Sequence, residues 1–352
     1  MSEVSLGGTL VGSNCHPYII AEAGSNHGGS LEEAKRLIAV AAAAGANACK
    51  FQKRSNRELY IQSYYDAPYD NELSYGKTYG EHRDFLEFDA DQYRELQAYA
   101  AGVKITFIAT PFDLPSVEFL EDLNVPYYKV ASGSVQNPLL LREIGSLGKP
   151  VVVSFGGARP DTIFRAVSEL EKGGCPLVLL HCTAAYPAPP AFLGLKRIGW
   201  LKEKFPQHVV GFSDHDDGIS IGAAAYAWGA RVLEKHITLD HSNRGTDHAF
   251  SLEPGGLQAY VRNLRDAWAA DQLLDHPVEL ELKPMYKMGY AVYPARDLEP
   301  GRVIHADDLV IKSPAEGLPG WAYDELIGRR LNCRVKAEQS LRWEYFDFGG
   351  GA

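Results

Sequence analysis

From Tyr18 onward the chain alternates short apolar runs with longer amphipathic stretches. The runs have the length of strands and lack a polar face, which is typical of parallel strands covered on both sides. They span residues 18–21, 46–52, 105–110, 127–131, 151–154, 177–181, 209–212 and 232–237. The amphipathic stretches between them include four that start at Ser30, Asp91, Asp161 and Gly218. Several start with Ser or Asp in a capping position and end at Gly, as helices do. Eight such units predict a closed (β/α)8 barrel.

A doubly wound open sheet is the alternative fold. It is less favoured because no glycine-rich phosphate loop follows the first strand. Residues 54–88, rich in Tyr, Asn, Asp and Gly, interrupt the second unit and are predicted to form a long loop. Loops of this length beyond a strand are usually functional lids or disordered segments.

The last quarter of the chain changes character. The barrel is predicted to occupy residues 1–272, and a charged stretch with two prolines, residues 273–287, is interpreted as a linker. Residues 288–352 contain short β-like runs at 291–293, 303–304 and 309–311, separated by turns. They predict a small β-rich domain that depends on packing against something else for full stability.

Composition excludes several classes of function. Of the 352 residues, 45% are hydrophobic and 23% charged, as in a globular protein. The net charge of −10, without a basic stretch, argues against nucleic acid as a partner. No run approaches the roughly 18 apolar residues of a membrane span, and the start of the chain lacks a signal-peptide pattern, so we expect a cytoplasmic protein. The five cysteines are odd in number and far apart, which predicts buried free thiols.

Polar residues recur where the predicted strands end. In a (β/α)8 barrel, ligands bind at the carboxyl ends of the strands, so these side chains should converge on one cavity. In chain order they are Glu22, Asn26, His27, Lys50, Gln52, Thr110, Lys129, Ser132, Ser154, Thr183, Tyr186, Ser213, His215 and His236.

The residue types indicate the chemistry. His215 and His236 end neighbouring strands and suit a divalent transition metal such as Mn²⁺, beside Glu22 as an oxygen ligand or proton acceptor. Lys50 and Lys129 provide point charges for a phosphate or carboxylate. Together these groups describe a site for a small polyanion and a carbonyl compound whose oxygen a metal ion would polarise.

Other polar residues have simpler interpretations. His181 lies inside an apolar run and is predicted to be a hydrogen-bonded core residue. His241 and His248 are predicted at the surface. The acids of GFSDHDDG, namely Asp214, Asp216 and Asp217, are interpreted as charges at the start of the helix that follows them.

Several motifs resemble those of one known family. In this order the chain reads IIAEAGSNHGG, ANACKFQK, ATPFD, YYKVASGS, HCTAAYP, GFSDHDDG, LEKHITLD and GTDHAFSLEPG. Over nearly the whole chain it is similar to the sialic acid synthases, which end in an antifreeze-like (SAF) domain. The segment YGKTYGEHRDFLEF is similar to animal-type members that use a phosphorylated sugar.

The resemblance implies a reaction and a role for each site residue. In this family, C3 of phosphoenolpyruvate attacks the aldehyde of N-acetylmannosamine or its 6-phosphate, water adds at C2, and phosphate leaves by C–O cleavage. His215 and His236 would hold Mn²⁺, with Glu22 beside the metal and the attacking water. The implied contacts to phosphoenolpyruvate are Lys50, Lys129, Ser132, Ser154 and Ser213, and those to the aminosugar are Gln52, Thr110, Tyr186 and Asp247. The family also implies a homodimer in which each SAF domain covers the partner's barrel.

The chain departs from the family pattern at substrate contacts. Many relatives have an acid at Ser134, a polar residue at Ala184, a different run at 154–157 and, in bacteria, an arginine near Ser313. An acceptor other than N-acetylmannosamine is therefore plausible. Two other functions stay open: a metal-dependent pyruvate aldolase, and a non-catalytic carbohydrate-binding or ice-binding protein.

Overall fold

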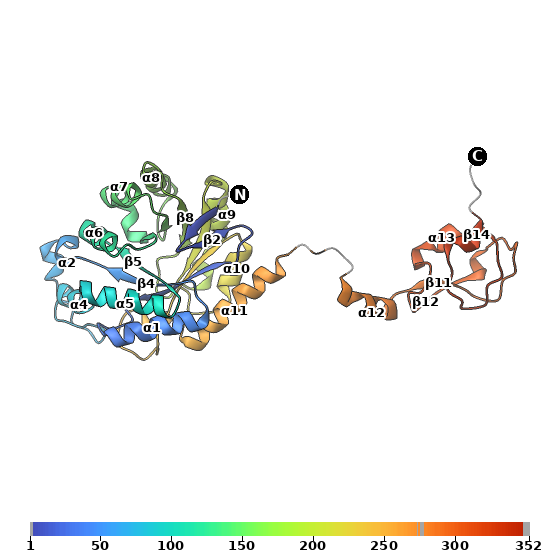
Figure 1. The fold of residues 1–352 in the computed structure, drawn as a ribbon, viewed down its shortest axis with the longest axis horizontal. Helices are drawn as coiled ribbons and strands as arrows, with labels where there is room; N and C mark the ends of the chain where they lie inside the picture. The colour runs from blue at the N-terminus through green and yellow to red at the C-terminus, as the bar shows by residue number, and fades with distance from the viewer. Residues whose placement is uncertain (1–2, 273, 275–277, 348–352) are drawn as a thin grey trace. The chain divides into compact units, whose positions relative to one another are not determined.

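Eight parallel strands lie inside a layer of helices in the first part of the chain (Figure 1). The computed structural model describes residues 3–272, 274 and 278–347. The strands are β3 (Tyr18–Gly24), β4 (Ala48–Lys53), β5 (Thr106–Pro111), β6 (Tyr128–Val130), β7 (Val151–Ser154), β8 (Leu177–Cys182), β9 (Val209–Asp214) and β10 (Val232–His236).

These strands form a ring. Their hydrogen-bonded order is β5-β4-β3-β10-β9-β8-β7-β6, and β5 and β6 contact each other where this order begins and ends. The first and last strands of the barrel pair directly, with Glu22 opposite His236. The predicted barrel is confirmed, and the open sheet is wrong.

The structure adds a hairpin that was not predicted. Strands β1 (Glu3–Leu6) and β2 (Thr9–Gly12) pair antiparallel. Side chains of the hairpin, including Leu6 and Val11, join a buried cluster with Tyr18, Ala48 and Val232, which lie at the amino ends of barrel strands. This apolar plug fills the end of the barrel opposite to the predicted cavity.

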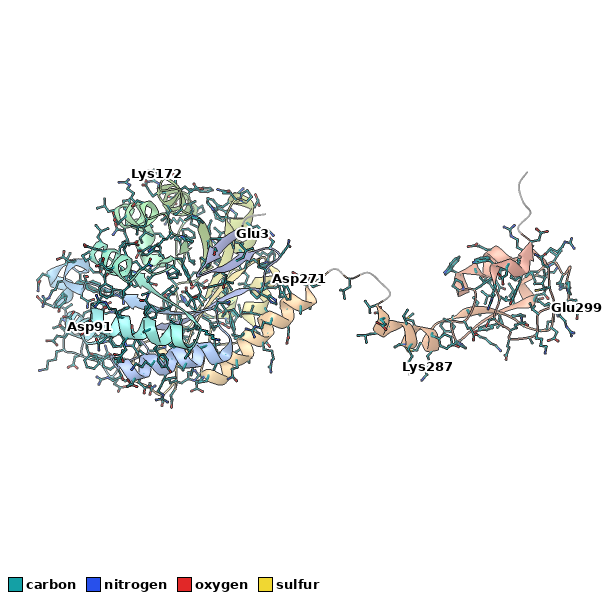
Figure 2. The ribbon with its side chains drawn as sticks, viewed as in Figure 1. Glu3, Asp91, Lys172, Asp271, Lys287 and Glu299 are labelled. Carbon is teal, nitrogen blue, oxygen red and sulfur yellow. The ribbon has the colours of Figure 1, made fainter. Side chains whose placement is uncertain are left out.

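Helices cover the outside of the ring. They are α1 (Leu31–Ala44), α5 (Ala90–Gly102), α6 (Leu114–Asp122), α7 (Pro138–Ser146), α8 (Pro160–Glu171), α9 (Lys196–Lys204), α10 (Ile221–Ala227) and α11 (Pro254–Ala270). Short 3-10 turns are η1 (Ser132–Gln136), η2 (Pro190–Phe192) and η3 (His248–Phe250). Helix α1 is capped as predicted, because Ser30 accepts from the Glu33 amide and Gly45 ends the helix at φ 83°. Charged side chains labelled in Figure 2, such as Asp91 and Lys172, lie on this outer layer.

The insertion at residues 54–88, here called the lid, is not the long loop expected. It contains α2 (Asn56–Leu59), α3 (Gln62–Tyr65) and α4 (Tyr79–Phe85). A carboxylate of α4, Asp84, holds the other two helices by accepting from Asn56 Nδ2 at 2.8 Å and from the Tyr65 hydroxyl. The Tyr65 ring packs so closely that a Cβ at Gly80 would lie 2.3 Å from it. The lid is therefore an ordered structure in which glycine permits close packing.

The chain divides into two compact units, Met1–Asp271 and Gln272–Ala352. Within the described residues the second unit contains α12 (Glu279–Met288), β11 (Ala291–Pro294), η4 (Ala306–Asp308), β12 (Leu309–Lys312), η5 (Gly320–Ala322), α13 (Tyr323–Leu326), β13 (Arg330–Leu331), η6 (Trp343–Tyr345) and β14 (Phe346–Asp347). Much of the expected linker 273–287 is thus helical, although residues 273 and 275–277 lie outside the described part. The predicted run 303–304 is not a strand, because Val303 forms only an isolated bridge with Arg330.

Two further sequence predictions concern the cysteines and the membrane. All five cysteines are free; Cys49, Cys175 and Cys182 are buried as predicted, whereas Cys15 and Cys333 are partly exposed. Across the described segments, none of the helices combines the length and the apolar character needed to cross a membrane.

We expect Asp308→Asn to destabilise the second unit by about 2 kcal/mol, because its buried carboxylate loses charge-assisted hydrogen bonds from two arginines. The Asp308 side chain is fully buried and accepts from Arg296 Nη2 at 2.6 Å and from Arg302 Nε at 2.9 Å. Burial alone would raise the pKa of Asp308, but the two arginines lower it to about 2. The carboxylate therefore stabilises the fold above the ordinary Asp pKa near 4, and this stabilisation is lost as the pH falls from about 4 to about 2.

This effect can be measured by chemical unfolding of the full chain at pH 7 and at a series of lower pH values. Asp307→Asn, at the exposed neighbouring residue, is the control and should leave stability unchanged. Equal destabilisation by both variants, or a difference that persists at pH 2, would contradict the assignment.

Candidate active site

One cavity of about 420 Å³ gathers every residue predicted to bind substrate or metal. It is lined by Glu22, Lys50, Gln52, Thr110, Lys129, Ser132, Ser154, Tyr186, Ser213, His215, His236 and Asp247. Most of them belong to the carboxyl ends of barrel strands or to the loops that follow. The convergence expected from the barrel is confirmed for these residues, whereas Asn26, His27 and Thr183 do not line this cavity. The roles of the lining residues stay predictions.

Two lysines and two glutamates form the buried part of this cavity. Lys50 Nζ lies 2.6 Å from Glu22 Oε2 and 3.6 Å from Glu234 Oε1, and Lys129 Nζ lies 3.7 Å from the same Glu234 oxygen. Burial favours the neutral form of Lys50, but Glu22 and Glu234 outweigh it and raise its pKa. Burial lowers the pKa of Lys129, and Glu234 offsets this only in part. Lys129 is therefore the less well compensated cation, and an anion in the cavity would stabilise it.

Glu234 was missed by the sequence analysis. Burial would raise its pKa, yet Lys129 and Lys50 lower it to about 2, so it is a carboxylate that balances both lysines. A signal for it existed in the sequence. Alternate residues of a strand share a face, so the inward direction of His236 also places Glu234 inward and Lys235 outward.

The outward Lys235 explains the acids of GFSDHDDG. Its Nζ lies 3.2 Å from Asp214 Oδ2 and 2.5 Å from Asp216 Oδ1, outside the ring of strands. The interpretation of these acids as helix-start charges is wrong, because Asp214 ends β9, Asp216 is buried, and α10 begins only at Ile221. Asp214 and Asp216 instead anchor the loop that carries His215, whereas Asp217 is exposed.

Hydroxyl groups surround the lysines. Lys129 Nζ donates to Ser154 Oγ at 2.7 Å, and Lys50 Nζ donates to Thr110 Oγ1 at 3.1 Å. Ser213 Oγ donates to Glu234 Oε1 at 3.2 Å, and Ser132 Oγ accepts from the Gly156 amide at 2.8 Å. Cations and hydroxyls in this arrangement can bind phosphate and carboxylate oxygens.

The two predicted metal ligands lie next to each other. The ring centroids of His215 and His236 are 5.2 Å apart. Mainly through burial, the pKa values fall to about 3 for His215 and about 4 for His236, so both imidazoles are neutral at pH 7. His215 Nδ1 donates to the Thr183 carbonyl at 2.8 Å, which leaves the lone pair of its Nε2 available.

The environment of His236 also fits a cation. Its buried Nδ1 has no hydrogen bond, and Asp247 Oδ2 lies 3.8 Å away. Among the described residues no three His, Cys, Asp or Glu side chains are grouped for a metal ion. A divalent ion held by His215 and His236 would therefore keep coordination positions for substrate or water.

Aromatic side chains pack against the two histidines. The Tyr186 ring lies 4.3 Å from His215, and Phe250, which was not predicted, lies 5.0 Å from His236. The neighbouring His248 is not at the surface as expected, since it is buried and bonded to Thr238 Oγ1. His241 is exposed, and His181 is buried with Nε2 2.6 Å from the Leu193 carbonyl, both as predicted.

Comparison with known proteins places this geometry in a family. The NeuB family model matches residues 37–273, and the SAF domain model matches residues 291–346. The chain belongs to the NeuB family. This NeuB-family enzyme is 38% identical to N-acetylneuraminate-9-phosphate synthase of Homo sapiens, over 97% of this chain and 96% of the relative. It is 35% identical to N,N'-diacetyllegionaminic acid synthase of Campylobacter jejuni, over 92% of this chain and 98% of the relative.

A solved structure shares the fold of this NeuB-family chain. The N-acetylneuraminic acid synthetase of Leptospira borgpetersenii superposes with a TM-score of 0.71 at 33% identity, covering 81% of this chain and 95% of that one. Two of the positions where this chain departs from the pattern, Ala184 and Gly156, line the cavity. Ser134 is buried but does not line it, and Ser313 belongs to the second unit. Of these positions, Ala184 and Gly156 are therefore the ones placed to affect what the cavity accommodates.

Proposed function

We propose that the protein condenses phosphoenolpyruvate with an N-acylated amino sugar to form a nonulosonic acid and phosphate. The observation that carries this proposal is the single cavity in which two buried lysines and their hydroxyl partners lie beside a pair of neutral histidines. Related chains are named as synthases of N-acetylneuraminate 9-phosphate, N,N'-diacetyllegionaminic acid and pseudaminic acid. Nonulosonic acids are the product class that these names share.

Phosphoenolpyruvate has two anionic groups, which matches the lysine end of the cavity. Its phosphate and carboxylate would lie against Lys50 and Lys129, with Ser132, Ser154 and Ser213 as hydroxyl partners. The incoming charge would compensate Lys129, which Glu234 balances only in part. Fixing both anionic groups orients C3 toward the second substrate and supplies much of the catalytic advantage.

The aldehyde of the sugar would lie at the histidines. Their neutral imidazoles fit Mn²⁺ or another divalent ion, which when bound supplies polarisation of the aldehyde oxygen. Asp247, Gln52, Thr110 and Tyr186 would orient the sugar. Gln52 is itself fixed, because its Nε2 donates to Glu22 Oε1 at 2.8 Å.

The bond changes follow from this placement. C3 of phosphoenolpyruvate forms a bond to the aldehyde carbon, whose oxygen takes a proton, and water adds at C2. Phosphate then leaves with the electron pair of its C–O bond, and the added oxygen loses its second proton to become the new ketone. Glu22 is a suitable acceptor for a proton of the water, since burial raises its pKa above the ordinary value despite the nearby Lys50.

The proposal includes a homodimer in which each SAF domain covers the cavity of the partner. Tyr186 supports it, because this tyrosine lines the cavity yet its residue is 55% exposed. A covering domain would bury the ring and exclude water from the reacting groups. The mass of the protein in solution and protection of Tyr186 from iodination in the dimer would test this arrangement.

The direct test is to incubate the Mn²⁺-loaded protein with phosphoenolpyruvate and a series of amino sugars that includes N-acetylmannosamine and its 6-phosphate. We expect phosphate release that depends on one of the sugars, and a product whose mass equals both substrates plus water minus phosphoric acid. Pyruvate formed from a sugar acid without phosphate release would indicate an aldolase instead. Sugar binding without turnover under all conditions would indicate a non-catalytic carbohydrate-binding protein.

A further inference from the structure

Two arginines line the cavity beside the residues assigned to the sugar. Arg54 directly follows β4, and Arg83 lies in α4 of the lid. Arg54 is only 8% exposed. Neither was identified from the sequence, because their approach depends on the fold of the lid.

The two guanidinium groups are close enough to affect each other and lack a carboxylate partner. Within the described residues, no Asp or Glu oxygen lies at ion-pair distance from either group. Arg54 Nη2 donates to Gln52 Oε1 at 2.6 Å, and Arg83 Nε donates to the Tyr79 hydroxyl at 3.1 Å. Burial lowers the pKa of Arg54, and repulsion by Arg83 lowers it further. Buried charges are normally paired, so this pair lacks an anion.

The nearest carboxylates are engaged elsewhere. Glu87 accepts from Lys53 Nζ at 2.9 Å and from the backbone amide of Arg54 rather than from its guanidinium. Asp247 lies beside His236 and acts on Arg83 only from beyond ion-pair distance, where it helps to raise the pKa of that arginine. The anion that would complete the arginine pair must therefore come from outside these residues.

Packing holds both arginines in place. The Arg54 guanidinium lies 3.8 Å from the centre of the Phe112 ring, and that of Arg83 lies 5.2 Å from the Tyr79 ring. Aromatic stacking restricts the two side chains and lowers the entropy lost when they bind a ligand. Within the part of the chain that the structure describes, only Arg54 Nη2 and Arg83 Nε have an acceptor, so the other guanidinium N–H groups can donate to an oxyanion.

The position along β4 indicates which substrate the arginines would contact. Lys50, Gln52 and Arg54 are alternate residues and follow one face of the strand toward the mouth of the cavity. Two such steps place the Arg54 backbone about 13 Å beyond that of Lys50. An anion bound at Arg54 would therefore lie nearer the mouth than one bound at Lys50, with Gln52, which is assigned to the sugar, between them.

We propose that Arg54 and Arg83 bind a phosphomonoester on the sugar substrate, at the end remote from its aldehyde. This inference rests on the proposed function and specifies its acceptor as a 6-phosphorylated N-acyl hexosamine. The phosphate takes bidentate hydrogen bonds from the two guanidinium groups, which present donors in a planar fork suited to phosphate oxygens.

The specificity ratio tests this proposal. It is kcat/KM for N-acetylmannosamine 6-phosphate divided by kcat/KM for N-acetylmannosamine, measured for wild type, Arg54→Gln and Arg83→Gln. We expect the wild type to favour the phosphorylated sugar and each variant to lower the ratio about 100-fold, as for a lost charge-assisted hydrogen-bonding partner. Arg57→Gln is the matched control, since Arg57 belongs to the same lid but stacks on Tyr65 and does not line the cavity.

The possible outcomes distinguish failure of the arginine site from failure of the proposed function. An unchanged ratio, or equal loss with both sugars, would show that the arginines only support the lid and would overturn the proposal. If neither sugar supports phosphate release, the proposed function fails for these acceptors, and calorimetry with the same two sugars then decides on the arginine site. Tighter binding of the phosphorylated sugar by wild type than by Arg83→Gln would support the site, and equal binding would overturn it.

Discussion

We expect His236→Ala to lower turnover at least about 1000-fold and to remove tight Mn²⁺ binding, because the metal ion supplies several kcal/mol of charge stabilisation. His236 pairs in register with Glu22, and its ring is adjacent to that of His215. No third His, Cys, Asp or Glu joins them to form a metal-binding group in the described parts of the chain. Loss of one of two protein ligands therefore removes half of the protein's contribution to metal binding. The metal content after dialysis measures Mn²⁺ binding, and the rate of phosphate release measures turnover.

The control for this prediction is another histidine next to the same sheet. His208 precedes β9 at the amino end of the barrel and contacts Glu171, far along the strand from the cavity. We expect His208→Ala to keep wild-type metal content and turnover. An equal metal content in His236→Ala and wild type would refute the assignment, and a circular dichroism spectrum would show whether the variant is folded.

The barrel was predictable because its strands are fully buried and are separated by capped helices. The hairpin of β1 and β2 could not be predicted, since each strand has only 4 residues and only β1 alternates exposed and buried positions. The prediction for the lid was also wrong. The helices α2 and α3 are single turns held by Asp84 and Tyr65, and such contacts between distant residues leave no periodic pattern.

The site could be predicted as far as the ends of the strands could be located in the sequence. His215, His236 and the two lysines follow directly from the topology of the barrel. Glu234 required the further step of asking which face of β10 each residue occupies. Arg54 lies at the start of the lid and Arg83 in α4 near its end, so bringing both to the cavity depends on the tertiary fold of the lid.

We expect Lys129→Met to lower kcat/KM for phosphoenolpyruvate about 100-fold to 1000-fold, as for the loss of a buried charge that binds an anion. Lys129 donates to Ser154 and lies 3.7 Å from Glu234, deep in the cavity. Methionine fills a similar volume but offers the substrate neither charge nor hydrogen bond. Steady-state kinetics with phosphoenolpyruvate as the varied substrate measure the loss.

The stability of the same variant distinguishes a binding role from a structural one. Removing one member of a buried ion pair is destabilising where it leaves the other charge uncompensated, but Lys129 is itself a poorly compensated cation whose burial costs stability. Glu234 also keeps Lys50 at 3.6 Å and Ser213 at 3.2 Å as partners. We therefore expect the melting temperature of Lys129→Met to equal or exceed that of wild type. Lys149→Met, which removes an outer ion pair with Glu121, should leave the kinetics unchanged. If Lys129→Met instead melted far below wild type and kept its activity, the lysine would serve the fold and not the binding of an anion.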